Sequence, residues 1–160
     1  MKNKYGKILK NIKSGKYECF LYILEQDYNK LIQNILEKGY QEVSFNSFEM
    51  MNFAEYLSEN KGLLIIGIEY PFEDEDLEDE INHLTRLVKR KEIDWDFFKA
   101  AITDQLDEIS RIKFNGNHSF LLTIQNNGII VVSEDAYENV ANMICDILNE
   151  NLWFSEQTSQ

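Results

Sequence analysis

Residues 63–68, with the sequence LLIIGI, form the most apolar stretch of this 160-residue chain. Their number and their β-branched content favour a buried strand over a helix. Before this stretch, Ser47 offers an N-cap hydroxyl for a helix that ends near residues 60–62. After it, Pro71 ends the strand. The sequence therefore predicts a buried strand that is preceded by a helix.

Helix and strand patterns alternate through the first half of the chain. Apolar spacing predicts helices at residues 2–13 and 27–38, and near-continuous or alternating apolar residues predict strands at 17–24 and 40–45. The strand at 17–24 is expected to be central, because it is apolar on both faces. Such alternation makes parallel pairing through right-handed crossovers plausible.

The second half begins with two helices and continues with short strands. The first helix carries the stripe Leu77, Ile81, Leu84 and Val88, and the second begins at Asp94 and buries Trp95, Phe98, Ile102, Leu106 and Ile109. Turns at Asn115-Gly116 and Asn127-Gly128 predict a three-strand meander at residues 111–114, 117–125 and 129–132. A last helix, with Ser133 as its N-cap, buries Tyr137, Val140, Ile144 and Ile147.

These patterns predict a single α+β domain over residues 1–160, with a mixed sheet of about six strands and helices packed on it. The domain has a short Lys-rich N-terminal helix, and its polar tail from about residue 155 is expected to be frayed.

The charge of the chain limits its partners. It has 28 acidic and 16 basic residues and a formal net charge of −12, which disfavours nucleic acid and anionic membranes as ligands and favours basic proteins. No apolar run approaches the roughly 20 residues of a spanning helix, and the start of the chain lacks a signal-peptide pattern. Two cysteines, Cys19 and Cys145, are expected to be reduced and buried. The cytoplasm is the predicted compartment.

An acidic run at residues 69–80 (EYPFEDEDLEDE) contains eight carboxylates and no basic residue. Acidic residues at a helix start, with Arg and Lys at its end, stabilise the helix through its macrodipole. Two or three acids satisfy that requirement, whereas eight repel one another. The excess predicts a docking surface for a basic partner, made of Glu73, Asp74, Glu75, Asp76, Glu78, Asp79 and Glu80.

Calcium binding at this run fails on spacing. Asp74, Asp76 and Glu78 match three positions of a calcium loop, but Asp79 stands where the loop needs Gly, and Thr85 where it needs a bidentate Glu. The sequence predicts no metal site and no cofactor.

Catalytic motifs are scarce in the sequence. The chain has no G-x-S-x-G, C-x-x-C or H-E-x-x-H motif and no phosphate-binding Gly-rich loop. His83 is expected on an exposed helix surface and His118 at a strand end, and either of them, with a nearby carboxylate, would be needed for a hydrolase. Asp94 is interpreted as a helix cap and Cys145 as a packing residue.

Six lysines and no acid occur in residues 1–16. This basic stretch is interpreted as a solvated helix face, with nucleic-acid or membrane contact, or pairing with an acidic run of another molecule, as alternatives.

The function hypothesis is a small acidic binding or inhibitory protein, acting as immunity proteins do when they neutralise nuclease toxins. A hydrolase that uses His83 or His118, and a subunit of a homo-oligomeric assembly, remain as alternatives. The oligomeric state is left open.

Overall fold

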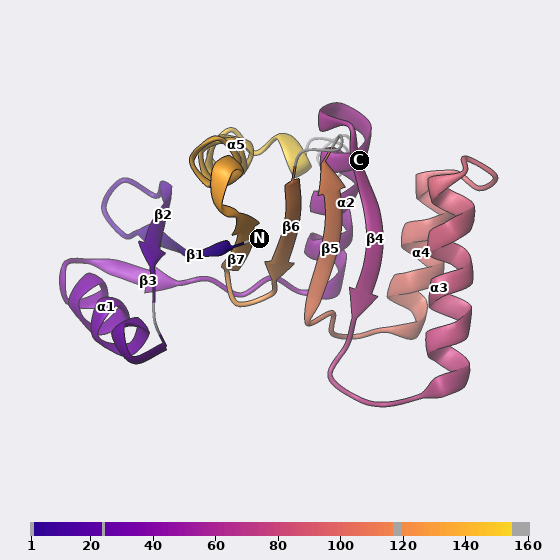
Figure 1. Cartoon of the computed structure of the whole chain (residues 1–160), viewed down its shortest axis with the longest axis horizontal. Coiled ribbons are helices and arrows are strands. Elements are labelled where there is room, and N and C mark those ends of the chain that lie inside the picture. Colours follow the sequence, from indigo (N-terminus) through magenta and orange to yellow (C-terminus); the bar gives the residue numbers. More distant parts are fainter. Residues whose placement is uncertain (1, 24, 117–119, 155–160) are drawn as a thin grey trace. The chain divides into compact units, whose positions relative to one another are not determined.

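The computed structural model of the chain describes residues 2–23, 25–116 and 120–154 (Figure 1). The chain divides into two compact units, and each contains both strands and helices. Unit 1 comprises the described parts of Met1–Ser44 and Asn127–Gln160, and unit 2 comprises those of Phe45–Asn126. The prediction of an α+β fold is confirmed.

Unit 1 is built on strand β1, which pairs with β2, β3 and β7. All three pairings are antiparallel. The elements of unit 1 are β1 (Asn3–Asn11), β2 (Tyr17–Tyr22), α1 (Glu25–Glu37), β3 (Tyr40–Glu42), β7 (Ile129–Ser133), the 3-10 turn η1 (Glu134–Ala136), α5 (Tyr137–Asn149) and the 3-10 turn η2 (Leu152–Phe154).

The helix predicted for residues 2–13 is wrong, because these residues form the central strand β1. Residues 6–9 are all buried in succession, as expected of a strand that is covered on both faces. Even Lys7 is only 1% exposed, and its ammonium donates a hydrogen bond to the Asn127 carbonyl and lies 3.6 Å from a Glu42 carboxylate oxygen. Burial lowers the pKa of Lys7, although Glu42 opposes this effect. The helical basic face, on which the alternatives for residues 1–16 depended, does not exist.

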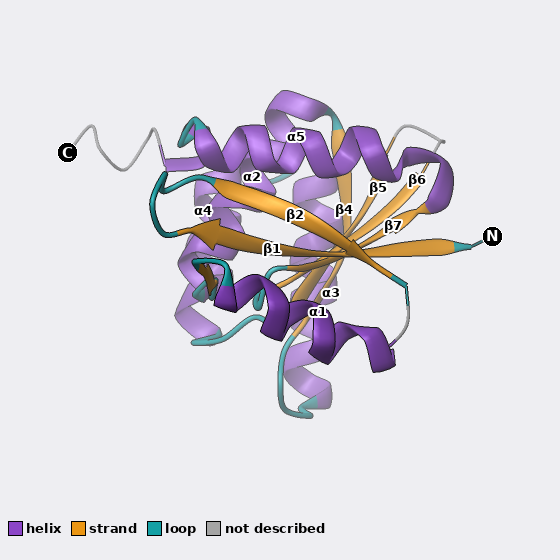
Figure 2. Ribbon diagram, turned by 90° about the vertical axis from the view of Figure 1, so that its left-hand side faces the viewer, coloured by secondary structure: helices purple, strands orange, loops and turns teal. Residues whose placement is uncertain are grey.

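Two helices cover the strands of unit 1. Figure 2 shows α5 on one side of β1 and β2 and α1 on the other. Strand β2 is the terminal strand, not the central one, and its side chains are mostly half-buried. Gly6 has no room for a side chain, because a Cβ built there would be 2.5 Å from the Tyr137 hydroxyl oxygen of α5 and 2.6 Å from Cys19 Sγ of β2.

Unit 2 contains three strands in the order β4–β5–β6, and both of its pairings are antiparallel. The strand pairings within each unit are therefore antiparallel and not mixed. Helices α2 and α3 contact β4, and α4 packs against both of these helices. Its elements are α2 (Ser47–Lys61), β4 (Leu63–Glu69), α3 (Glu75–Lys89), α4 (Trp95–Gln105), β5 (Arg111–Gly116) and β6 (Phe120–Gln125).

Strand β4 is buried on one face only. Leu63, Ile65 and Ile68 are buried, whereas Leu64 and Ile66 are 49% and 44% exposed. The predicted strand is confirmed, but it is buried on one face only, because α2 and α3 contact β4 while Leu64 and Ile66 stay exposed.

Several local predictions need correction. Asn46, rather than Ser47, caps α2, in a capping box with Glu49. Asn115 and Gly116 continue strand β5 and do not form a turn, since Gly116 pairs with Phe120. The turn at Asn127-Gly128 is confirmed, with Gly128 at a φ of 88°. Ser133 makes no capping hydrogen bond with its side chain and precedes the 3-10 turn η1 instead of α5 directly. The predicted frayed tail lies outside the described residues.

Candidate functional site

The acidic surface comprises the seven residues predicted to dock a basic partner, and all of them are exposed. They lie on the loop after β4 and on the first turns of α3. Asp74 is the N-cap of α3, because its carboxylate accepts a hydrogen bond of 3.1 Å from the Leu77 N–H. The members of the acidic surface are Glu73, Asp74, Glu75, Asp76, Glu78, Asp79 and Glu80.

Basic residues nearby do not neutralise this surface. Glu69, the first carboxylate of the run, lies 2.6 Å from Lys113 Nζ and 3.5 Å from Arg111 Nε. Within the described part of the chain, no ion pair involves residues 73–80. The acidic surface therefore presents seven negative charges to solvent, of which the helix dipole of α3 compensates only part.

An aromatic hollow of about 350 Å³ lies beside the start of α3. Tyr70 and Phe72 are in contact there, with ring centroids 4.9 Å apart, and the Tyr70 hydroxyl donates to the Asp74 carbonyl at 3.2 Å. Burial, together with the negative charges of Glu78, Asp74 and Asp79, raises the pKa of Tyr70 above its ordinary value. Four carboxylates of the acidic surface line the same hollow: Glu73, Asp74, Glu75 and Glu78.

Aromatic faces and carboxylates together suit a cationic ligand. A Lys ammonium or an Arg guanidinium can lie over an aromatic ring and still reach a carboxylate. Phe72 is half exposed, so its ring is available for such a contact. The charge pattern of the sequence predicted the carboxylates as binding residues but not Tyr70 and Phe72, although both aromatic residues lie inside the acidic run.

Only part of the predicted surface converges on the hollow. Asp76, Asp79 and Glu80 do not line it.

In the described ranges, no group of three or more His, Cys, Asp or Glu side chains is arranged to hold a metal ion.

The histidines and cysteines give no catalytic arrangement in the described residues. His83 is exposed on α3, as predicted, and lines neither this hollow nor the one described below. His118 lies outside the described residues. Cys19 and Cys145 are free, partly buried thiols, and burial raises the pKa of both, to about 12 for Cys145.

Asp94 caps α4 through a 2.8 Å hydrogen bond from the Phe97 N–H, and Trp95 is buried, so the helix-cap interpretation is confirmed.

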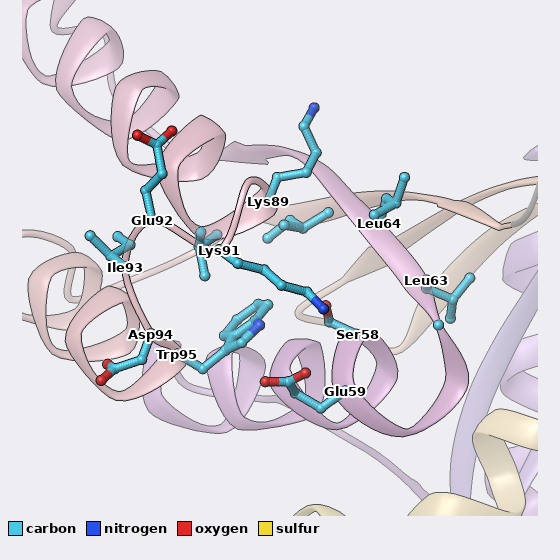
Figure 3. A pocket seen from close by; sticks show the side chains of 13 residues that line it. Ser58, Glu59, Leu63, Leu64, Lys89, Lys91, Glu92, Ile93, Asp94 and Trp95 are labelled. Atoms are coloured by element: carbon cyan, nitrogen blue, oxygen red, sulfur yellow. The ribbon is translucent and has the colours of Figure 1, made fainter.

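A second hollow, of about 560 Å³, lies where α2 ends, β4 begins, α3 ends and α4 begins. Figure 3 shows the Lys91 side chain extending toward Ser58, with Trp95 and Glu59 below it in this view. Its lining mixes Lys89 and Lys91 with the carboxylates Glu59, Glu92 and Asp94 and with apolar side chains. This mixture does not select one class of ligand.

Lys91 at this hollow has a backbone conformation that favours glycine. It follows the C-cap of α3 with a φ of 61°, and its N–H and that of Glu92 donate to Val88 and Leu87 at 3.1 Å and 2.9 Å. This is the Schellman arrangement, in which the position of Lys91 is usually Gly.

Lys91→Gly is therefore expected to raise the free energy of unfolding by about 0.5–1 kcal/mol, because it removes the strain of a left-handed residue with a Cβ. Urea denaturation measures the change. Lys89→Gly is the matched control, since the same substitution in the last helical turn should lower stability by about 0.5–1 kcal/mol. Equal destabilisation by Lys91→Gly and Lys89→Gly would show that Lys91 is not in the left-handed position of a Schellman arrangement.

Comparison with protein-family models, curated proteins and solved structures finds no match for this chain. Over the described residues, none of the helices has both the length and the apolar character needed to span a bilayer.

Proposed function

We propose that this chain is a small cytoplasmic binding or inhibitory protein that docks a basic protein partner on its acidic surface. The observation that carries the proposal is the aromatic hollow, where four exposed carboxylates adjoin Tyr70 and Phe72. Inhibition of a basic toxin, in the manner of an immunity protein, is the specific form of this function. Neither nucleic acid nor a membrane is the proposed partner, because both carry phosphates that the acidic surface repels.

The acidic surface and the hollow would contribute different parts of the binding energy. Charge complementarity mainly raises the association rate and selects basic partners. The two aromatic rings would hold one cationic side chain of the partner after contact, and desolvation strengthens that contact. A hydrolase function has less support, because His83 lies in neither hollow.

Reversing three charges of the acidic surface tests the proposal. The variant Glu73→Lys, Glu75→Lys, Glu78→Lys keeps the helix cap Asp74 and is expected to slow association with the basic partner by about 10-fold or more. Partners are first captured from host lysate at low and high salt, and their association rates are then measured by surface plasmon resonance.

The matched control reverses three exposed carboxylates elsewhere, Glu134, Asp135 and Glu138, with the same change in net charge. This control should slow association by no more than about 2- to 3-fold, because it alters only the overall field. Equal slowing by both variants, or no slowing by either, means that the acidic surface is not the docking site.

A further inference from the structure

Helix α3 presents a stripe of charged residues directly opposite its buried face. Its buried face contains Ile81, Leu84, Thr85 and Val88. At 100° per residue, the side chains that point away from this face are three or four positions apart. They are Asp76, Asp79, His83, Arg86 and Arg90, the last at the C-cap, and all five are exposed.

The charges of this outward stripe are antisymmetric about His83. Asp79 and Asp76 precede His83 by four and seven residues, and Arg86 and Arg90 follow it by three and seven. When two such helices lie antiparallel with His83 at the two-fold axis, Asp76 of each lies directly opposite Arg90 of the other, and Asp79 lies within one residue, about 1.5 Å of axial rise, of Arg86. A parallel arrangement would put like charges opposite each other. We propose that the outward stripe is the contact surface for α3 of a second copy of this chain, in a two-fold symmetric dimer.

Intramolecular partners do not compete strongly for these charges. In the described residues, Asp76, Asp79 and Arg86 take part in no ion pair. Arg90 lies 4.0 Å from Glu92, and both side chains are more than half exposed, so this pair is easily exchanged for another. The outward stripe shares Asp76 and Asp79 with the acidic surface, but none of its residues lines the aromatic hollow, and the dimer does not depend on the proposed docking function.

The salt concentration determines how much of the protein is dimeric. The net charge of −12 makes two copies repel at long range, but the Debye length is about 10 Å at 0.1 M salt, which screens that repulsion more than it weakens contacts of about 4 Å. One pair of helices buries less than the roughly 1,200 Å² of stable interfaces. The dissociation constant is therefore expected to be on the order of 0.1–1 mM at this salt concentration and to rise at least about 10-fold at 1 M.

Complementary charge reversal tests the dimer. The variant Asp76→Arg, Asp79→Arg makes the outward stripe wholly basic, and Arg86→Asp, Arg90→Asp makes it wholly acidic. Sedimentation velocity of the full chain at concentrations up to about 1 mM should show each variant as a monomer and their equimolar mixture as a dimer. Circular dichroism checks that each variant is folded, and the recovery in the mixture also guards against misfolding.

The control variant Glu73→Arg, Glu78→Arg has the same change in net charge as the basic variant but lies at the aromatic hollow. It should still dimerise, while it impairs docking of a basic partner, so the two proposals fail separately. A wild-type monomer at 1 mM and 0.1 M salt, a mixture that stays monomeric, or a control that loses the dimer equally would each overturn the proposal.

Discussion

Gly6→Ala is expected to lower the free energy of unfolding by about 3 kcal/mol, because atoms of three neighbouring side chains already occupy the space of the new methyl group. A Cβ at this position would be 2.5 Å from the Tyr137 hydroxyl oxygen, 2.6 Å from Cys19 Sγ and 3.2 Å from an Ile130 carbon. These atoms belong to α5, β2 and β7, so no single side chain can move to relieve the overlap. Denaturation followed by tryptophan fluorescence measures the loss.

Two further variants identify the cause of that loss. Tyr137→Phe in the Gly6→Ala background removes the nearest atom and should recover part of the stability, with a coupling above about 0.5 kcal/mol in a double-mutant cycle. Gly67→Ala is the control, since a Cβ there meets nothing within 4 Å and its φ is not left-handed. That control should change stability by less than about 1 kcal/mol. A loss at Gly6 no larger than at Gly67 would show that β1 and α5 do not approach this closely.

The second large effect is expected at Lys99, where a partly buried charge joins α2 to α4. Its ammonium lies 2.6 Å from a Glu55 carboxylate oxygen and 3.1 Å from the Asn52 side-chain oxygen. Lys99 is 14% exposed and Glu55 18%, so water replaces the lost partner poorly. Lys99→Met should therefore cost about 3 kcal/mol in urea denaturation, near the lower end of values for fully buried pairs.

A second substitution separates the lost pair from lost packing. Lys99→Met with Glu55→Met removes both charges and should recover most of the loss, because apolar replacement of a buried pair is often neutral. Arg90→Met is the control at the exposed Arg90–Glu92 pair and should cost less than about 0.5 kcal/mol at dilute concentration. If Lys99→Met costs no more than Arg90→Met, the Lys99 pair does not hold the two helices together.

Helices α1, α3 and α4 were predictable because their apolar residues recur at helical spacing, and the predicted cap Asp94 marks the start of α4. Strand β1 was not, because Tyr5, Ile8, Leu9 and Ile12 fit a helical stripe, and the residues that make this segment a strand are distant in sequence. Lys7, for example, pairs with Phe20 and with Ile129. Local spacing carries no information about such neighbours, and tertiary pairing overrides it.

In the candidate site, too, one part was predictable from the sequence and another was not. The acidic surface was predictable because charge and helix position can be read from the sequence. The aromatic hollow was not, because the contact between Tyr70 and Phe72 depends on the path of the loop around Pro71. Similarly, Asn115-Gly116 has the composition of a turn, but its pairing with β6 extends the strand to Gly116.

The position of β1 in unit 1 also affects the order in which the chain can fold. β1 and its partner β7 are separated by the whole of unit 2, which is one continuous stretch of sequence. The whole of unit 2 is translated before β7 and α5, and its contacts join residues that are closer in sequence, so they can form first. β1 can pair with β2 and β3 early, but the part of β1 that pairs with β7 stays without that partner until unit 2 has been made.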